Sequence, residues 1–122
     1  MKIRIEDHVN FDGGKMAKIA LATTERAQLD LYCVAPGQYQ KPHTHRDQDK
    51  IYYVLEGAGR FSLGDKEERL SPGEALVAAA GVEHGLFNDG ADPLLILVVV
   101  TPPPPHGVPS QGVAPSQGVA KP

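Results

Sequence analysis

The chain has 122 residues, enough for one domain with a single hydrophobic core. Hydrophobic residues make up 41% and charged residues 22%, and the net charge of -3 provides no basic footprint for nucleic acid. The longest apolar run, residues 94–100, is far below the roughly 20 residues that a membrane-spanning helix needs. The N-terminus has no apolar signal core, so we expect a cytoplasmic protein without nucleic-acid or membrane partners.

Short strand-like segments follow one another along most of the chain, separated by turns that contain Gly or Pro. No segment shows a convincing helical period. This pattern predicts an all-β sandwich or jelly-roll barrel. In chain order, strands are expected over Ile3–His8 (a weak edge strand) and over residues 16–24, 28–35, 51–56, 60–63, 67–70, 75–79, 84–88 and 94–101, with 37–42 as an extended or looping approach.

The composition changes near Thr101. Residues 102–105 are four consecutive prolines, and the six-residue sequence 109–114 is repeated as 115–120. Few groups there could build a core, so we predict a barrel domain over residues 1–101 and a disordered or extended low-complexity tail over 102–122. The alternative role for the tail is a proline-rich ligand for a partner domain. His106 lies in the tail and is not expected to bind metal.

Three histidines form the main candidate site. His43 and His45 are two apart, so in an extended segment both side chains point to one face. His84 ends a second run much further along the chain. Three neutral imidazoles with open coordination positions suit Zn, Fe, Mn, Ni, Co or Cu, so a divalent transition metal is the predicted cofactor. The alternative is that these residues line a barrel mouth without metal.

The spacing of these residues resembles the two sequence motifs of the cupin superfamily. Gly37, His43, His45 and Gly57 fit the first motif, and Gly73, Gly81, His84 and Asn88 fit the second, with Ala79 where proline is usual. The resemblance implies a double-stranded β-helix, which is a jelly-roll barrel, with a pocket for a small molecule. Cupins also commonly pair through their sheets, which implies a homodimer. The fold hosts many activities and does not select one.

The acidic ligand of the family's first motif has no clear counterpart. Counting back six residues from Gly57 places Lys50 at its position, whereas counting forward from His45 reaches Asp49. A regular strand would turn Lys50 inward. A β-bulge would instead turn Lys50 outward and make Asp49 a possible fourth metal ligand. A third interpretation has no metal, and Lys50 with the histidines then binds an anionic small molecule.

Further residues are predicted to line the pocket because they share the face of Lys50 or belong to the second motif. They are Lys50, Tyr52, Val54, Leu86 and Asn88. The opposite face of the same strand, with Ile51, Tyr53 and Leu55, is also apolar and should be covered by another sheet or by a second subunit.

These observations predict a small metal-binding cupin, with dioxygenase or isomerase chemistry on a small oxygenated compound as one outcome. The alternatives are a non-enzymatic cupin module that binds a small, anionic ligand, and an accessory cupin with a structural role. The sequence names no general base besides the histidines, so whether the protein is an enzyme stays open at this point.

Overall fold

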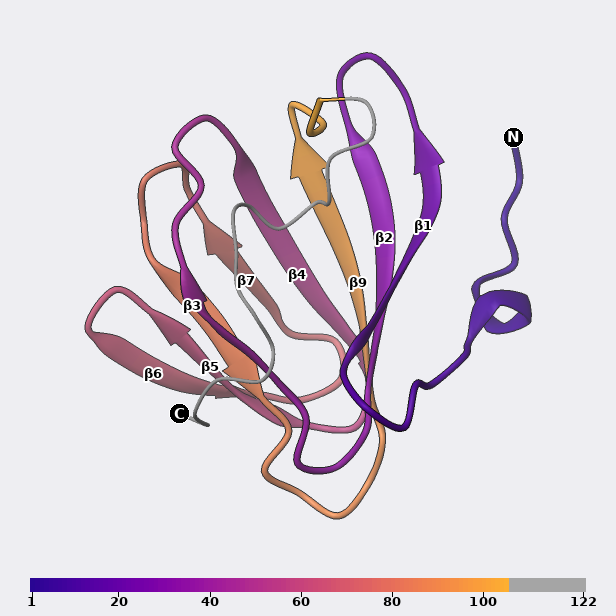
Figure 1. Ribbon diagram of the computed structural model, residues 1–122, viewed down its shortest axis with the longest axis vertical. Coiled ribbons are helices and arrows are strands. Elements are labelled where there is room, and N and C mark those ends of the chain that lie inside the picture. Colours follow the sequence, from indigo (N-terminus) through magenta and orange to yellow (C-terminus); the bar gives the residue numbers. More distant parts are fainter. Residues whose placement is uncertain (106–122) are drawn as a thin grey trace.

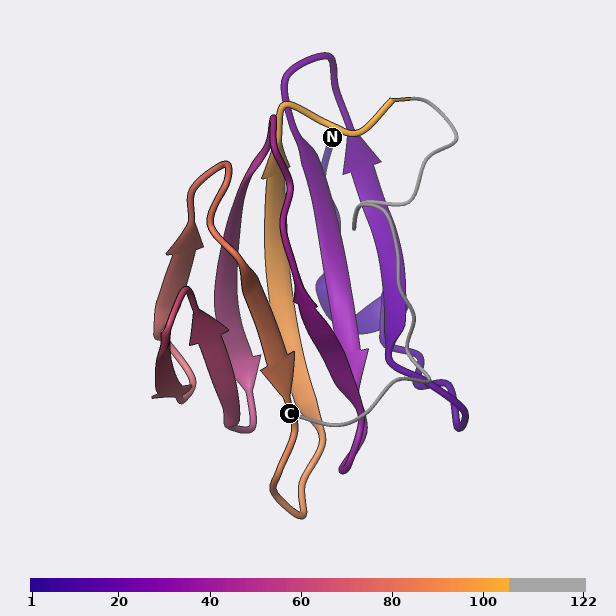
Figure 2. The same cartoon turned by 60° about the vertical axis from the view of Figure 1, so that its left-hand side comes forward.

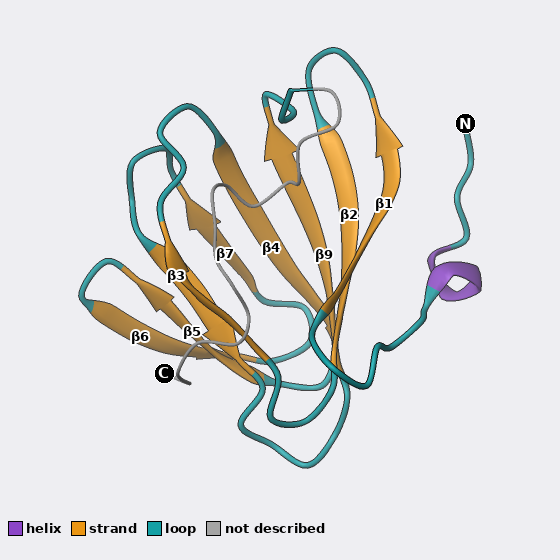
Figure 3. Ribbon diagram, in the orientation of Figure 1, coloured by secondary structure: helices purple, strands orange, loops and turns teal. Residues whose placement is uncertain are grey.

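The computed structural model describes residues 1–105, and its strands form two antiparallel sheets (Figure 1). A short 3-10 helix, η1 (Ile5–His8), precedes them (Figure 3). The strands are β1 (Ala17–Thr23), β2 (Gln28–Val34), β3 (Tyr39–His43), β4 (Asp49–Glu56), β5 (Gly59–Leu63), β6 (Lys66–Leu70), β7 (Ala75–Ala78), β8 (His84–Phe87) and β9 (Leu94–Thr101). The predicted all-β jelly-roll fold is confirmed.

The larger sheet has the order β1-β2-β9-β4-β7, and the smaller one has the order β3-β8-β5-β6. Figure 2, turned by 60° from Figure 1, shows β3 and β8 in front of the larger sheet. The β9 strand lies between β2 and β4, as its apolar, β-branched sequence predicted. The last strand of residues 1–105 therefore joins elements that are distant in sequence.

The core lies between the two sheets and follows the two-residue alternation of the strands. Alternate residues of β9, from Leu94 to Val100, are fully buried, while those between them are partly exposed. Tyr32, Tyr52 and Phe61 are the large aromatic side chains of this core. Tyr52 packs edge to face against both of the others, with ring centroids 6.1 and 5.7 Å away.

The expected edge strand over residues 3–8 is wrong. Residues 5–8 form η1 instead, in which the Asp7 amide donates to the Arg4 carbonyl and the Arg4 side chain pairs with Glu6 and Asp7. The alternation there was weak, and these local contacts stabilise a turn where no neighbouring strand pairs with the segment. The approach to His43, by contrast, is a strand, β3, which pairs with β8.

The N-terminal segment covers part of the outer face of the larger sheet. Residues 5–11 and the ends of β4 and β9 line a surface cavity of about 450 Å³, with Phe11, Leu55 and Leu95 among its walls. Further along this face, Tyr53 and Val77 remain 42% and 59% exposed. The outer apolar face predicted from the sequence is therefore covered at one end by the chain itself and open at the other.

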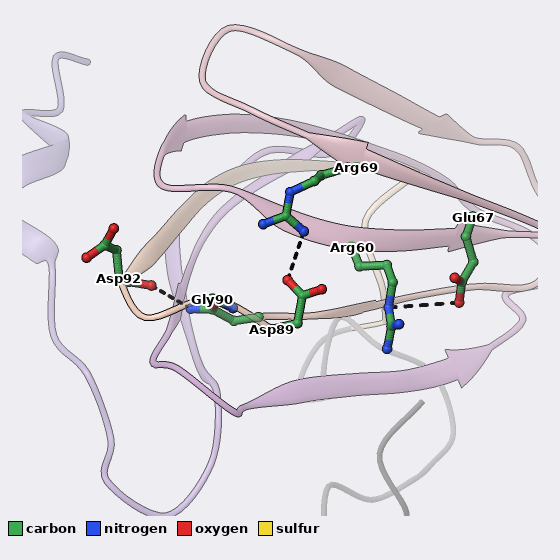
Figure 4. Close-up of polar contacts among 7 residues, drawn as sticks. Arg60, Glu67, Arg69, Asp89, Gly90 and Asp92 are labelled. Atoms are coloured by element: carbon green, nitrogen blue, oxygen red, sulfur yellow. Dashed lines mark hydrogen bonds and ion pairs between the residues drawn. The ribbon is translucent and has the colours of Figure 1, made fainter.

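At the edge of the smaller sheet, polar contacts fix β6 and the loop after β8 (Figure 4). Arg69 donates to the Asp89 carboxylate at 2.9 Å, and Arg60 lies 4.0 Å from Glu67. Because both pairs lie at the surface with at least one exposed partner, each contributes at most about 1 kcal/mol. Within residues 1–105, no helix is long and apolar enough to cross a membrane. The predicted tail, including His106, lies beyond these residues from position 106 onward.

Candidate metal centre

The three histidines predicted from the sequence come together in the structure. His43 ends β3 and pairs directly with His84, the first residue of β8, and His45 follows in the loop after β3. The ring centroids are 4.9 Å apart for His43 and His45, 4.5 Å for His43 and His84, and 5.5 Å for His45 and His84. One candidate ligand atom from each histidine lies within 4.8 Å of those of the other two.

A glycine allows the two histidine strands to approach closely. A Cβ added to Gly85, next to His84, would lie 2.8 Å from the Gln40 carbonyl oxygen and 2.8 Å from the Pro42 nitrogen. Any larger residue would therefore push β3 away from β8. The sequence analysis did not identify Gly85, although a glycine directly after a candidate ligand in a strand can indicate such an approach.

Backbone carbonyls orient two of the imidazoles. His43 Nδ1 lies 2.8 Å from the Lys41 carbonyl oxygen, and His84 Nδ1 lies 2.9 Å from that of Val82. Since a carbonyl only accepts hydrogen bonds, each Nδ1 carries the proton and each Nε2 presents its lone pair. The Nε2 atoms of His43, His45 and His84 are all buried without a hydrogen-bond partner in the described part of the chain. This is the arrangement that metal-ligating histidines have.

The protonation state of the histidines also favours metal. Burial lowers the pKa of His43 to about 3, and a smaller contribution from the positive charge of Lys50 acts in the same direction. Burial followed by the charge of Lys50 lowers the pKa of His45 to about 4. Burial is also the main cause at His84, whose pKa falls to about 4. All three rings are therefore neutral at pH 7 and can coordinate a metal without first losing a proton.

The donor set and its spacing fit a transition metal after a small adjustment. A tetrahedral site with metal–nitrogen bonds of about 2.1 Å has its nitrogens about 3.4 Å apart. Rotations of the imidazoles can close the difference from the observed separations of up to 4.8 Å. These three histidines could thus bind a metal and leave at least one position for another ligand.

Lys50 and Asp49 are the two candidates for the position of the acidic ligand in the family motif, and Lys50 is the buried one. Its side chain is 0% exposed, and Lys50 pairs with Val100 of β9 and Ala78 of β7 without a bulge between it and Val54. Asp49 is exposed, and its carboxylate accepts a hydrogen bond of 2.8 Å from the Ala80 amide. The structure thus has the regular-strand register and places the Asp49 carboxylate outside the histidine cluster.

The Lys50 ammonium group lies among aromatic rings. Its Nζ is 5.5 Å from the centroid of the Tyr32 ring and 5.7 Å from that of Tyr52, and it has no hydrogen-bond partner among the described residues. Burial lowers the pKa of Lys50 to about 7, and the negative charge of Asp30 opposes this shift. A buried ammonium group without a partner is costly inside a protein, and a lysine with such a lowered pKa is a candidate functional residue.

Two further charged residues of the larger sheet were missed by the sequence analysis. Asp30 is buried, and its Oδ1 accepts a hydrogen bond from Gln28 while Oδ2 has no partner within residues 1–105. Lys18 on β1 has a pKa lowered to about 7, first by burial and then by the charge of Lys50. Asp30 lies two residues before Tyr32 on the same strand, so both side chains point to the same face of the sheet. This spacing could have indicated that Asp30 lies inside the barrel.

The other predicted pocket residues have mainly structural contacts. Val54 and Leu86 belong to the core cluster. Tyr52 lies 5.9 Å from the His84 ring, centroid to centroid, and its hydroxyl donates to Gln40. Asn88 is fully buried, and its amide nitrogen donates to the carbonyls of Val34 and Asp92. Of these four, only Tyr52 contacts a candidate metal ligand through an aromatic pair.

Comparisons with known proteins agree with the fold. A family model described as a cupin domain matches residues 30–100. The crystal structure of TT1209 from Thermus thermophilus has a TM-score of 0.82 and 44% identity, covering 85% of this chain and 100% of that one. KdgF from a Halomonas species has a TM-score of 0.74 and 27% identity, covering 84% and 94%.

Named relatives with longer chains match in part. Acireductone dioxygenase from Candida albicans is 38% identical over 61 residues, which are 46% of this chain and 34% of that enzyme. A germin-like protein from Arabidopsis thaliana is 31% identical over 90 residues, covering 70% and 41%. The chain therefore spans less than half the length of either relative. With the family model matching more than half of its residues, this chain belongs to the cupin family.

Proposed function

We propose that this protein is a metal-dependent cupin that binds one divalent transition metal on His43, His45 and His84. The observation that carries the proposal is the set of three buried, unpartnered Nε2 atoms, with one candidate ligand atom per histidine lying within 4.8 Å of the others. The proposed activity is that of a dioxygenase or isomerase acting on a small oxygenated compound. The partial similarity to an acireductone dioxygenase supports the oxygenase alternative.

Backbone carbonyls prepare two of the three histidines for metal binding in this proposal. The carbonyls of Lys41 and Val82 hold His43 and His84 in the tautomer that presents Nε2. The metal, when bound, would supply Lewis acidity toward a carbonyl or enolate oxygen, or a binding position for O₂. Tyr52 packs against His84 and limits its rotation. His45, His84 and Tyr52 are buried and His43 is partly exposed, so the site would be shielded from bulk water on most of its sides.

A non-enzymatic binding module is the second candidate, and Lys50 is the observation that favours it. A lysine stands where a metal-ligating acid would lie, and a cation there repels a metal ion. In that case, the histidines and Lys50 would hold a small anionic ligand directly.

Metal analysis of protein purified without chelators or nickel resin separates these functions. A redox-active metal at one equivalent supports an oxygenase, and zinc supports an isomerase or lyase. Protein that contains no metal and takes up none on titration would exclude the proposed function and favour the binding module.

We also propose that the protein forms a homodimer through the open part of its larger sheet. Tyr53 and Val77 remain exposed on a face that also carries Ile51, Leu97 and Val99. An apolar sheet surface of this kind is typical of subunit contacts, and two-fold symmetry is the commonest closed assembly. Light scattering at micromolar concentration is expected to give twice the chain mass of 13.1 kDa. A monomer mass would contradict the proposal.

A further inference from the structure

Two lysines and one acidic residue face the interior of the barrel. On the inner face of the larger sheet, Lys18 and Lys50 are opposed by the carboxylate of Asp30, and no ion pair within 4 Å joins these groups in the described part of the chain. The three imidazoles are neutral. Adding a divalent metal makes this interior still more positive. An anion bound in the interior would offset the charge of that metal and stabilise the protonated form of Lys50.

Lys50 and the histidine cluster lie close to the same aromatic ring. Lys50 Nζ is 5.7 Å from the centroid of Tyr52, and the ring of His84 is 5.9 Å from that centroid. Lys50 also lowers the pKa of each of the three histidines through its charge. The ammonium group and the histidine cluster are therefore both neighbours of Tyr52, and a small molecule that bridges them would lie beside this ring.

The unpartnered atoms indicate two recognition points for that molecule. Lys50 Nζ, fully buried, offers N–H donors that no described residue accepts, and three protein donors leave open positions on a metal. A carboxylate satisfies an ammonium group with a charge-assisted hydrogen bond. An oxygen on the adjacent carbon can coordinate the metal at the same time.

We propose that the ligand of this barrel is a small 2-oxo or 2-hydroxy carboxylic acid whose carboxylate accepts a hydrogen bond from Lys50 Nζ while the neighbouring oxygen binds the metal. The inference rests on the metal site proposed above and adds the chemical class of the ligand. Because Lys50 stands at the position of the acidic metal ligand in the family motif, the carboxylate beside the metal comes from the bound molecule and not from the protein. Asp30 stabilises the ammonium form from a distance, since its charge favours the protonated lysine.

The test compares pyruvate with pyruvamide, its neutral amide of the same shape, by calorimetry on zinc-loaded protein. We expect the wild type to prefer pyruvate. Lys50→Met should reduce that preference at least tenfold, or about 1.4 kcal/mol, mainly through weaker pyruvate binding, because the charge-assisted hydrogen bond to the carboxylate is lost. Lys50→Gln keeps a hydrogen-bond donor without the positive charge, and this variant should also lose most of the preference for pyruvate. Lys66→Met, at an exposed lysine of β6, is the matched control and should keep it.

Zinc titration of the wild type comes first and separates the two proposals. Zinc binding without measurable pyruvate binding, or a preference unchanged in Lys50→Met and Lys50→Gln, overturns the ligand class and leaves the metal site intact. A wild type that binds no zinc overturns both. Circular dichroism and the zinc stoichiometry of each variant show whether a lost preference reflects a folded site.

Discussion

Replacing Lys50 by methionine should stabilise the metal-free protein. Burial lowers the pKa of Lys50 from 10.5 to about 7, which costs the folded state about 4 kcal/mol at pH 7, because each pH unit corresponds to ~1.4 kcal/mol. Attraction of the ammonium group to the Tyr32 and Tyr52 rings offsets about 1–2 kcal/mol of this. Methionine has a similar shape and needs no hydrogen bond. We therefore expect a gain of about 2–3 kcal/mol at pH 7.

The pH dependence identifies the cause of that gain. The folded pKa of Lys50 lies below its unfolded value, so the unfolded chain binds the extra proton between pH 7 and 10.5. The cost of Lys50 is therefore fully present below pH 7 and disappears as the pH rises toward 10.5. The difference between Lys50→Met and wild type should shrink by more than half between pH 7 and pH 9.5.

Urea unfolding followed by circular dichroism in the presence of a chelator measures both quantities. Lys66→Met, at an exposed position of β6, is the control and should change the free energy of unfolding by less than about 0.5 kcal/mol. The reasoning is refuted if Lys50→Met is no more stable than wild type at pH 7, or if its advantage is the same at pH 9.5.

Two further predictions concern metal affinity and acid sensitivity. Lys50→Glu restores an acidic ligand and removes a positive charge, so the zinc affinity measured by calorimetry should rise at least tenfold, or about 1.4 kcal/mol. Asp49→Ala should change the zinc affinity little, because the Asp49 carboxylate contacts Ala80. The reverse pattern would mean that Asp49 turns inward. The pKa values of His43, His45 and His84 are about 3 to 4 in the folded state, against 6.5 ordinarily. The unfolded chain therefore binds more protons than the folded chain below pH 6.5. The free energy of unfolding of the metal-free protein should fall by on the order of 2 kcal/mol per histidine between pH 6.5 and 5. Urea midpoints that do not move over this range would contradict the buried, neutral state of the three rings.

The fold and the common face of His43 and His45 could be predicted because they depend on local patterns. The period of two in the strands and the two-residue spacing of His43 and His45 are visible in the sequence alone. The position of His84 opposite His43 depends on pairing between β3 and β8, which the family motifs implied and local pattern could not establish.

The orientation of Lys50 could not be predicted, because it depends on where a bulge lies. Both orientations were compatible with the sequence, and a slip of one residue exchanges the faces of a strand. The register is set by the pairing of β4 with β9 and β7, two strands that follow much later in the chain. The strand parity of Asp30 with Tyr32 could have indicated its inward position, but not which charged residues it faces across the sheet.

Zinc titration of the chelator-treated wild type and of His84→Ala is the most direct test of the central claim. The account predicts one zinc ion per wild-type chain and at least a hundredfold weaker binding in His84→Ala, since two imidazoles remain of the three that lie within 4.8 Å. Absence of zinc binding by the folded wild type, or equal affinity in the two proteins, would contradict a metal centre on His43, His45 and His84.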